Sequence, residues 1–238
     1  MFALDWRGRD RDNKQEVVPQ NSRTAMANDV PSEAEVEIAH VLFVDIVGYS
    51  KRSINEQANI VAQLNQIVRE TRHCRLADAA GKLIRIPTGD GMALVFFNTL
   101  EAPVQCAMEV CAALRSNPEI PVRMGIHSGP VNSVADVNDR ASVAGAGINI
   151  ARRIMDLADA GHILVSKRVA EDLLQSGHWH GELRDLGEIQ AKHGVRISIF
   201  NVYGENFGNP TIPTHIRRLR RRLAGMPKRL KYFVNVQH

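Results

Sequence analysis

The first half of the chain alternates between continuous apolar runs and apolar residues at helical spacing. Residues 38–45 end in a run of β-forming residues, which predicts a strand buried on both faces. Ser53 and Glu56 form a capping-box pattern, and apolar residues follow at helical spacing. We therefore expect one long helix that ends at Gly81. Residues 82–97 predict two strands around a Gly-Asp-Gly turn.

The elements that follow complete a recognisable order. A helix at about 100–116 and a strand at 121–129 give the sequence β-α-β-β-α-β. This order predicts an α+β fold with a ferredoxin-like core, in which both helices lie on one face of an antiparallel sheet. Additional C-terminal strands and helices should follow, at 147–158 (helix), 162–165 (strand), from Ser166 (short helix), and at 182–191 and 195–203 (strands).

Composition divides the 238 residues into three parts: an N-terminal extension over 1–36, a folded domain over 37–208 and a basic tail over 209–238. The tail holds eight Arg and Lys residues and no acid, so a net charge of +4 for the chain leaves −4 for the rest. Such a tail could touch anionic lipid or nucleic acid, but we favour a solvated, partly helical segment that supports the domain. Without a basic–aromatic stripe, no nucleic-acid partner is expected.

Three further features concern the cellular setting. There is no apolar run of about 18 residues, so no membrane span is expected. The charged N-terminus lacks the apolar centre of a signal peptide. Cys74, Cys106 and Cys111 have no metal-ligand spacing, and an odd number of cysteines favours reduced thiols in a cytoplasmic protein.

Two acidic residues carry the candidate chemistry. Asp45 ends the first strand, where a carboxylate is costly to bury unless something pairs with it. Asp90 lies in the turn of the central hairpin, which neighbours the first strand in a βαββαβ sheet. Two adjacent carboxylates repel unless cations lie between them, and a pair of divalent ions suits phosphoryl transfer. The alternative for Asp45 is a plain strand end with a helix-capping acid.

Four motifs extend this hypothesis. "FVDIVGYS", "TGDG", "VRMGIHSGPV" and "GAGINIARR" match, in order, the motifs of class III nucleotidyl cyclases, over about residues 38–204. The chain thus resembles a family that converts a nucleoside triphosphate to a 3′,5′-cyclic monophosphate and pyrophosphate. The resemblance implies a head-to-tail homodimer, with each active site shared between subunits and an inactive monomer.

The resemblance also implies residue roles for metal and phosphate binding. Asp45 and Asp90 would bind two divalent cations, Mg²⁺ or Mn²⁺, with help from the Ile46 carbonyl. The phosphate-binding positions would be the N–H groups of Gly48, Tyr49 and Ser50, together with the side chains of Arg123 and Lys192.

The last motif implies the two remaining catalytic roles. Asn149 would orient the ribose, and Arg153 would stabilise the pentavalent transition state. Asn149 and Arg153 are four residues apart and so share one face of a helix.

The sequence departs from the family at the position that reads the base. Adenylate cyclases usually carry a lysine at the position of Ile86 and an aspartate or threonine at that of Ser142. Arg85 is adjacent to Ile86, but neighbouring strand residues point to opposite faces. Arg85 could enter the pocket only if Pro87 shifted the register.

Three interpretations follow from this departure. The first is a cyclase for a pyrimidine nucleotide, UTP or CTP, since the chain resembles the stand-alone pyrimidine cyclases of bacterial anti-phage (Pycsar-type) signalling. The second is an adenylate cyclase with a relaxed base pocket. The third is a catalytically degenerate, dimeric nucleotide-binding module.

Overall fold

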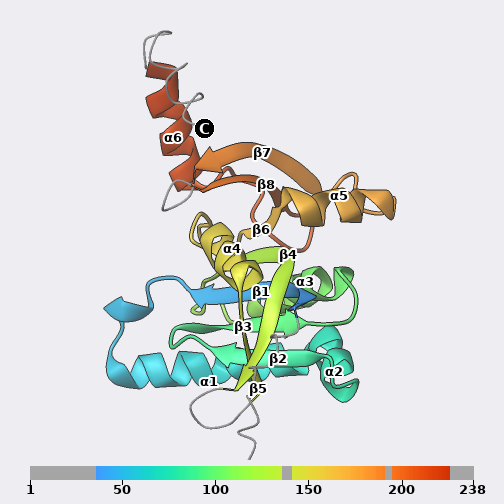
Figure 1. Cartoon of the computed structure of the whole chain (residues 1–238). Coiled ribbons are helices and arrows are strands. Elements are labelled where there is room, and N and C mark those ends of the chain that lie inside the picture. Colours follow the sequence, from blue (N-terminus) through green and yellow to red (C-terminus); the bar gives the residue numbers. More distant parts are fainter. Residues whose placement is uncertain (1–35, 136–140, 191–194, 226–238) are drawn as a thin grey trace, which may run out of the picture. The chain divides into compact units, whose positions relative to one another are not determined.

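The computed structural model describes residues 36–135, 141–190 and 195–225, all within one compact unit, Ala34–His238. Its strands form one sheet in the order β2-β3-β1-β4-β6-β8-β7, and β5 pairs with β4 (Figure 1). Within the first four strands of this order each strand is antiparallel to its neighbours, whereas β4 and β6 are parallel. The predicted ferredoxin-like α+β core with a C-terminal extension of the sheet is therefore confirmed.

The strands and helices occur in the predicted order, with the following bounds. The strands are β1 (Val36–Ile46), β2 (Leu83–Pro87), β3 (Gly91–Phe96), β4 (Val122–Ala135), β5 (Ala141–Ala144), β6 (Ile163–Ser166), β7 (Leu183–Gln190) and β8 (Arg196–Val202). The helices are η1 (Tyr49–Lys51), α1 (Ile54–Glu70), α2 (Arg72–Ala79), α3 (Glu101–Leu114), α4 (Ala146–Met155), α5 (Lys167–Gln175) and α6 (Thr214–Gly225). In the described ranges, no helix is both long and apolar enough to cross a membrane.

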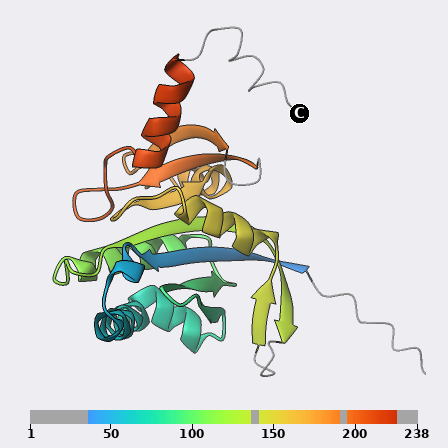
Figure 2. The ribbon, with the colours of Figure 1, turned by 90° about the vertical axis from the view of Figure 1, so that its left-hand side faces the viewer.

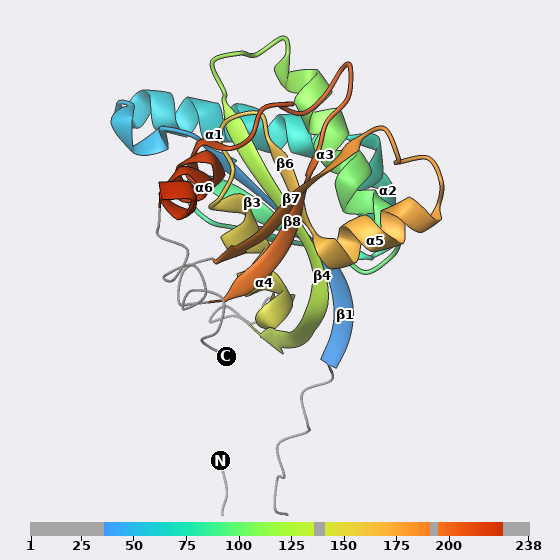
Figure 3. The same ribbon diagram turned by 90° about the horizontal axis from the view of Figure 1, so that it is seen from above.

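The two faces of the sheet carry different helices. One face packs on α1, α2, α3 and α5 around a large apolar cluster that includes Leu42, Leu94 and Ile126. The other face packs on α4 through a smaller cluster that includes Phe43, Ala93 and Met155. Figure 3 shows α3 and α4 on opposite sides of β4. The strict alternation along β1 places odd-numbered residues of its C-terminal half on the α4 face.

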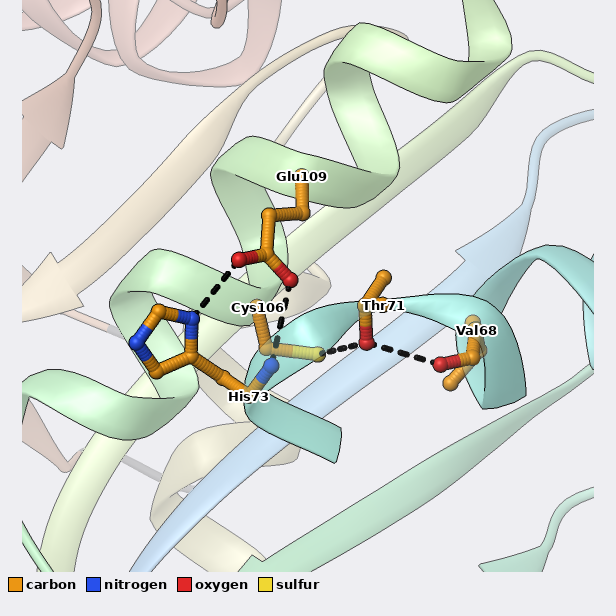
Figure 4. Close-up of polar contacts among 5 residues, drawn as sticks. All are labelled: Val68, Thr71, His73, Cys106 and Glu109. Atoms are coloured by element: carbon orange, nitrogen blue, oxygen red, sulfur yellow. Dashed lines mark hydrogen bonds and ion pairs between the residues drawn. The ribbon is translucent and has the colours of Figure 1, made fainter. Parts of the chain in front are cut away.

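The prediction of one long helix that ends at Gly81 is wrong, because the structure has two helices, α1 and α2, separated at Thr71. Thr71 takes an extended ψ of 142°, and its hydroxyl donates to the Val68 carbonyl at 2.8 Å and contacts the Cys106 sulfur at 3.4 Å. The backbone N–H of His73 donates to Glu109 of α3 at 3.3 Å, and the His73 ring Nδ1 lies 2.7 Å from the same carboxylate (Figure 4). These contacts replace the hydrogen bonds that the break removes.

One further difference concerns the second half. β4 is longer than the predicted 121–129 strand and continues into a hairpin with β5, which the sequence pattern did not indicate (Figure 2). Buried Val131 and Val143 give that hairpin an apolar side. The start of the basic tail forms α6, which stands beside β7 and β8 at the end of the sheet opposite β2 (Figure 1).

Candidate active site

Asp45 is placed by two neighbouring strands at the end of β1. It is paired in register with Gly91 of β3 and with Arg123 of β4, on the face of the sheet that α4 covers. The residue is only 6% exposed, so its carboxylate needs partners. A side chain at Gly91 would collide with the Val44 carbonyl, which explains why glycine follows Asp90 here.

The hairpin turn brings Asp90 to Asp45. The backbone N–H of Ile46 donates to the Asp90 carbonyl at 3.0 Å and fixes the turn against the end of β1. Burial raises the pKa of the Asp45 carboxyl above its ordinary value, and the charge of Asp90 and a hydrogen bond to it raise this pKa further. The turn therefore brings Asp90 near enough to Asp45 for its charge to act on the Asp45 carboxyl, and their joint role in binding metal stays a prediction.

Arg123 is the main cationic partner of Asp45. Its Nε and one terminal guanidinium nitrogen each lie 2.8 Å from the same Asp45 oxygen, in a charge-assisted contact that lowers the pKa of Asp45 against the effect of burial. The same terminal nitrogen lies 3.8 Å from an oxygen of Asp156. Arg123 thus bridges the end of β1 and the segment that follows α4, and its predicted contact with phosphate stays a prediction.

The donors around Asp45 suit a hard divalent cation. Two carboxylates and the neighbouring backbone of Ile46 supply oxygen ligands, which Mg²⁺ and Mn²⁺ prefer. In the described part of the chain, no group of three or more His, Cys, Asp or Glu side chains is suited to a metal ion. A cation at Asp45 and Asp90 would therefore complete its ligand set with water and phosphate oxygens.

The predicted phosphate loop follows β1 directly. Gly48 has a φ of 76° and caps η1, a short 3₁₀-helix that begins at Tyr49. At the start of a helix the first N–H groups lack intrahelical acceptors. Within the described residues, no hydrogen bond is assigned to the backbone N–H groups of Gly48, Tyr49 and Ser50. Donors of this kind are available to an anion beside Asp45.

Helix α4 carries the other predicted catalytic pair on its surface. Its backbone approaches β4 so closely that a side chain at Gly125 would collide with the backbone of Met155. Ala151 and Met155 are buried on the sheet side, whereas Asn149 is exposed and Arg153 is half-buried. Among the described residues, no hydrogen bond or ion pair joins Asn149 or Arg153 to either acidic residue of the same subunit.

The position predicted to read the base, Ile86, lies in apolar surroundings. Ile86 is paired with Ala93 and packs on the α4-side cluster, so it shares the face of Asp45. The register of β2 and β3 is regular up to Pro87, and Arg85 lies on the opposite face. There its guanidinium forms an ion pair with Asp78 at 2.8 Å. Arg85 therefore does not replace the missing lysine.

Two predicted residues are described only in part or not at all. Ser142 lies in β5, where its backbone is in register with Val134, but its side chain is outside the description. Lys192 lies outside the described residues. Asp156 is a site residue that sequence reasoning missed. The only signal was an acid three positions after Arg153, and nothing in the pattern linked it to Arg123.

The fold and the paired carboxylates define an α+β domain of the nucleotide-cyclase type. A family model for the adenylate and guanylate cyclase catalytic domain matches residues 31–202, and the chain belongs to this family. A protein of Rhizobium meliloti named "Putative adenylate cyclase 3" is 28% identical over 141 residues, which cover 56% of this chain. This chain spans only 23% of the length of that relative.

Solved structures share the fold at low sequence identity. The guanylate cyclase domain of RhGC from Catenaria anguillulae, in complex with GTP, is 20% identical, with a TM-score of 0.57 over 72% of this chain and 99% of that one. The adenylyl cyclase CyaB from P. aeruginosa is also 20% identical, with a TM-score of 0.58 over 74% of this chain and 100% of that one. The fold is therefore common to relatives that are named for different purine nucleotides.

Proposed function

We propose that this chain cyclises a nucleoside triphosphate to a 3′,5′-cyclic monophosphate and releases pyrophosphate. The observation that carries the proposal is the convergence of Asp45 and Asp90, two acidic residues 45 positions apart, at the end of β1. Membership of the cyclase family and the oxygen-rich donor set support the same conclusion. The substrates and partners of the full-length relative are not used to argue this proposal, because this chain spans only 23% of that protein.

In the proposed reaction the ribose 3′-hydroxyl attacks the α-phosphorus, the bond to the bridging oxygen breaks, and pyrophosphate leaves. Asp45, the Ile46 carbonyl and Asp90 would hold two divalent cations, Mg²⁺ or Mn²⁺, which supply charge neutralisation and acidify the attacking hydroxyl. The N–H groups of Gly48 to Ser50 and the Arg123 guanidinium bind the β- and γ-phosphates. Asn149 orients the ribose, and Arg153 stabilises the charge on the pentavalent phosphorus.

We propose that each site is shared between two copies of the chain. Asn149 and Arg153 lie on the solvent-facing side of α4 and do not pair with the acidic residues of their own subunit. A second copy related by two-fold symmetry would present its Asn149 and Arg153 to the first copy's Asp45 and Asp90. Two equivalent sites would then form at the interface, and a monomer would be inactive.

We propose that the substrate is a pyrimidine nucleotide, UTP or CTP. The side chain at the base-reading position, Ile86, packs on an apolar cluster and offers no hydrogen bond to a purine edge. A serine hydroxyl at 142 can donate to O4 of uracil or accept from N4 of cytosine. A product of this kind fits a second messenger, such as cyclic UMP, in anti-phage signalling.

A second candidate is an adenylate cyclase with a relaxed base pocket. It is favoured by the curated relative, which is named as an adenylate cyclase. A third candidate, a dimeric binding module without catalysis, is opposed by the retention of both acidic residues together with Asn149 and Arg153.

The test is incubation of the purified chain with ATP, GTP, CTP and UTP in turn, with Mn²⁺ and separately with Mg²⁺, and identification of each product by mass spectrometry. A single cyclic pyrimidine nucleotide supports the first assignment, and cyclic AMP supports the second. Absence of product from all four nucleotides, with dimer and metal present, would favour the binding module.

A further inference from the structure

Helix α6 presents a dense set of arginines on the side that faces away from the domain. Successive residues of an α-helix are about 100° apart around its axis. Four exposed arginines therefore spread over an arc of about 140°, and these are Arg217, Arg218, Arg221 and Arg222. Arg217 also donates to the Thr214 hydroxyl at 3.4 Å, and its charge helps to lower the pKa of the nearby Asp159 carboxyl. No acidic residue occurs in the helix itself.

The apolar side of α6 is already used by the domain. Ile216 is fully buried, and Leu219 packs on the same cluster, which contains Ile154 of α4. The Arg220 guanidinium donates to the Leu186 carbonyl at 2.7 Å, and the Thr214 backbone N–H donates to Asp159 at 2.7 Å. The helix is therefore attached to the domain with its charged side outward, and Ile216 and Leu219 are not available for insertion into a lipid layer.

The placement of these charges works against the stability of the isolated helix. Arg217 with Arg221, and Arg218 with Arg222, are like-charge pairs four residues apart, which destabilise a helix. Arg217 and Arg218 also lie near the N-terminus, where the helix dipole favours negative charge. The Asp159 carboxylate already accepts a hydrogen bond at that N-terminus and lies near Arg217. A polyanion on the outer face would relieve the remaining repulsion within the two like-charge pairs.

We propose that the outer face of α6 binds the phosphate backbone of double-helical DNA without sequence preference. Arginines spread over a wide arc can reach more phosphates in a concave groove than on a flat membrane surface. The major groove of B-form DNA is wide enough to hold one α-helix between its two phosphate backbones. The guanidinium group suits bidentate contacts with phosphate. No Phe, Tyr or Trp occurs in α6, so the face lacks the usual platform for stacking on single strands, which a duplex does not need.

The experiment measures the affinity of the full chain for a fluorescent 24-base-pair duplex at several salt concentrations, without nucleotide or divalent metal. The logarithm of the binding constant falls linearly with the logarithm of the salt concentration, and each phosphate contact makes this slope steeper by about 0.9. The double variant Arg218→Gln/Arg222→Gln should therefore have a slope shallower by about 1.8. Two duplexes of unrelated sequence should bind equally. The outcome is separate from the proposed catalysis, because no turnover is involved.

A matched control is Arg72→Gln/Arg75→Gln, which removes two exposed arginines from α2 and changes the net charge equally. This control should leave the slope close to that of the parent chain. Equal loss in both variants, an unchanged slope in the α6 variant, or α6-dependent binding to phosphatidylserine vesicles without duplex binding would each overturn the proposal. Thermal melting checks that both variants fold, and Arg221→Gln, with a slope shallower by about 0.9, provides a milder second test.

Discussion

The two ends of the proposed nucleotide site are held by the sheet in different ways. The phosphate end lies where three paired strands meet, and Asp45 is buried there between Gly91 and Arg123. The base end lies on β2, at the edge of the sheet, and on the β4–β5 hairpin. Buried charges need fixed partners, so the first end tolerates little change. An edge strand has one free side, so the second end can vary without disturbing the core.

The largest expected effect comes from the phosphate end. If the proposed reaction is correct, Asp45→Ala should lower turnover by about a thousandfold or more. It removes a ligand of the metal ions, which stabilise the charged transition state by several kcal/mol. A cyclisation assay under saturating substrate and Mn²⁺ measures the loss. Asp78→Ala is the control, since Asp78 pairs with Arg85 on the opposite face of the sheet. Retained activity in Asp45→Ala would reject the metal assignment.

A somewhat smaller effect is expected on α4. Arg153→Ala should lower turnover by about 10²- to 10³-fold, the range for removing one group that stabilises the transition state. The neighbouring and more exposed Arg152→Ala should change little. Mixing the inactive Asp45→Ala and Arg153→Ala proteins should restore part of the activity, because one intact site forms in a mixed dimer. Failure of the mixture, with mixed dimers demonstrated, contradicts shared sites.

The base end should respond in selectivity rather than in rate. Ile86→Lys with Ser142→Asp restores the polar pair that adenylate cyclases usually carry, and we expect the ratio of kcat/KM for ATP over UTP to rise about tenfold, as for one gained hydrogen-bonding contact. Ile84→Lys is the matched control, because Ile84 lies on the same strand and face but further from the hairpin turn. An equal change of this kcat/KM ratio in the control would contradict the assignment of Ile86 to the base pocket.

The smallest effect concerns His127, on the strand that carries Arg123. Burial lowers the pKa of His127 to about 4, and its Nδ1 lies 2.8 Å from the Ser166 hydroxyl. Between about pH 6.5 and pH 4 the unfolded chain binds a proton that the folded chain does not, so stability falls as pH falls. Urea unfolding should show a loss of about 1 to 2 kcal/mol from pH 7 to pH 5. The same measurement on His127→Asn should show a smaller loss.

The sequence by itself determined the order of the elements and the position of the two acidic residues of the proposed phosphate end. The capping box at Ser53 and the apolar runs of β1 and β3 specify local structure directly. In the ferredoxin-like arrangement of these elements the first strand pairs with the third, and this pairing brings Asp90 to the end of the strand that carries Asp45. The opposite orientations of Arg85 and Ile86 also followed from the alternation of side chains along a strand.

Only the tertiary structure decided the features that depend on contacts between distant segments. The break at Thr71 is stabilised by Glu109 and Cys106 of another helix, so a pattern of apolar spacing could not reveal it. Arg123 lies between Asp45 and Asp156 for the same reason, since these residues come from three separate elements. Local conformational preferences depend on neighbouring residues and can be read from the sequence. Ion pairs between distant residues form only when the strands and helices have packed together.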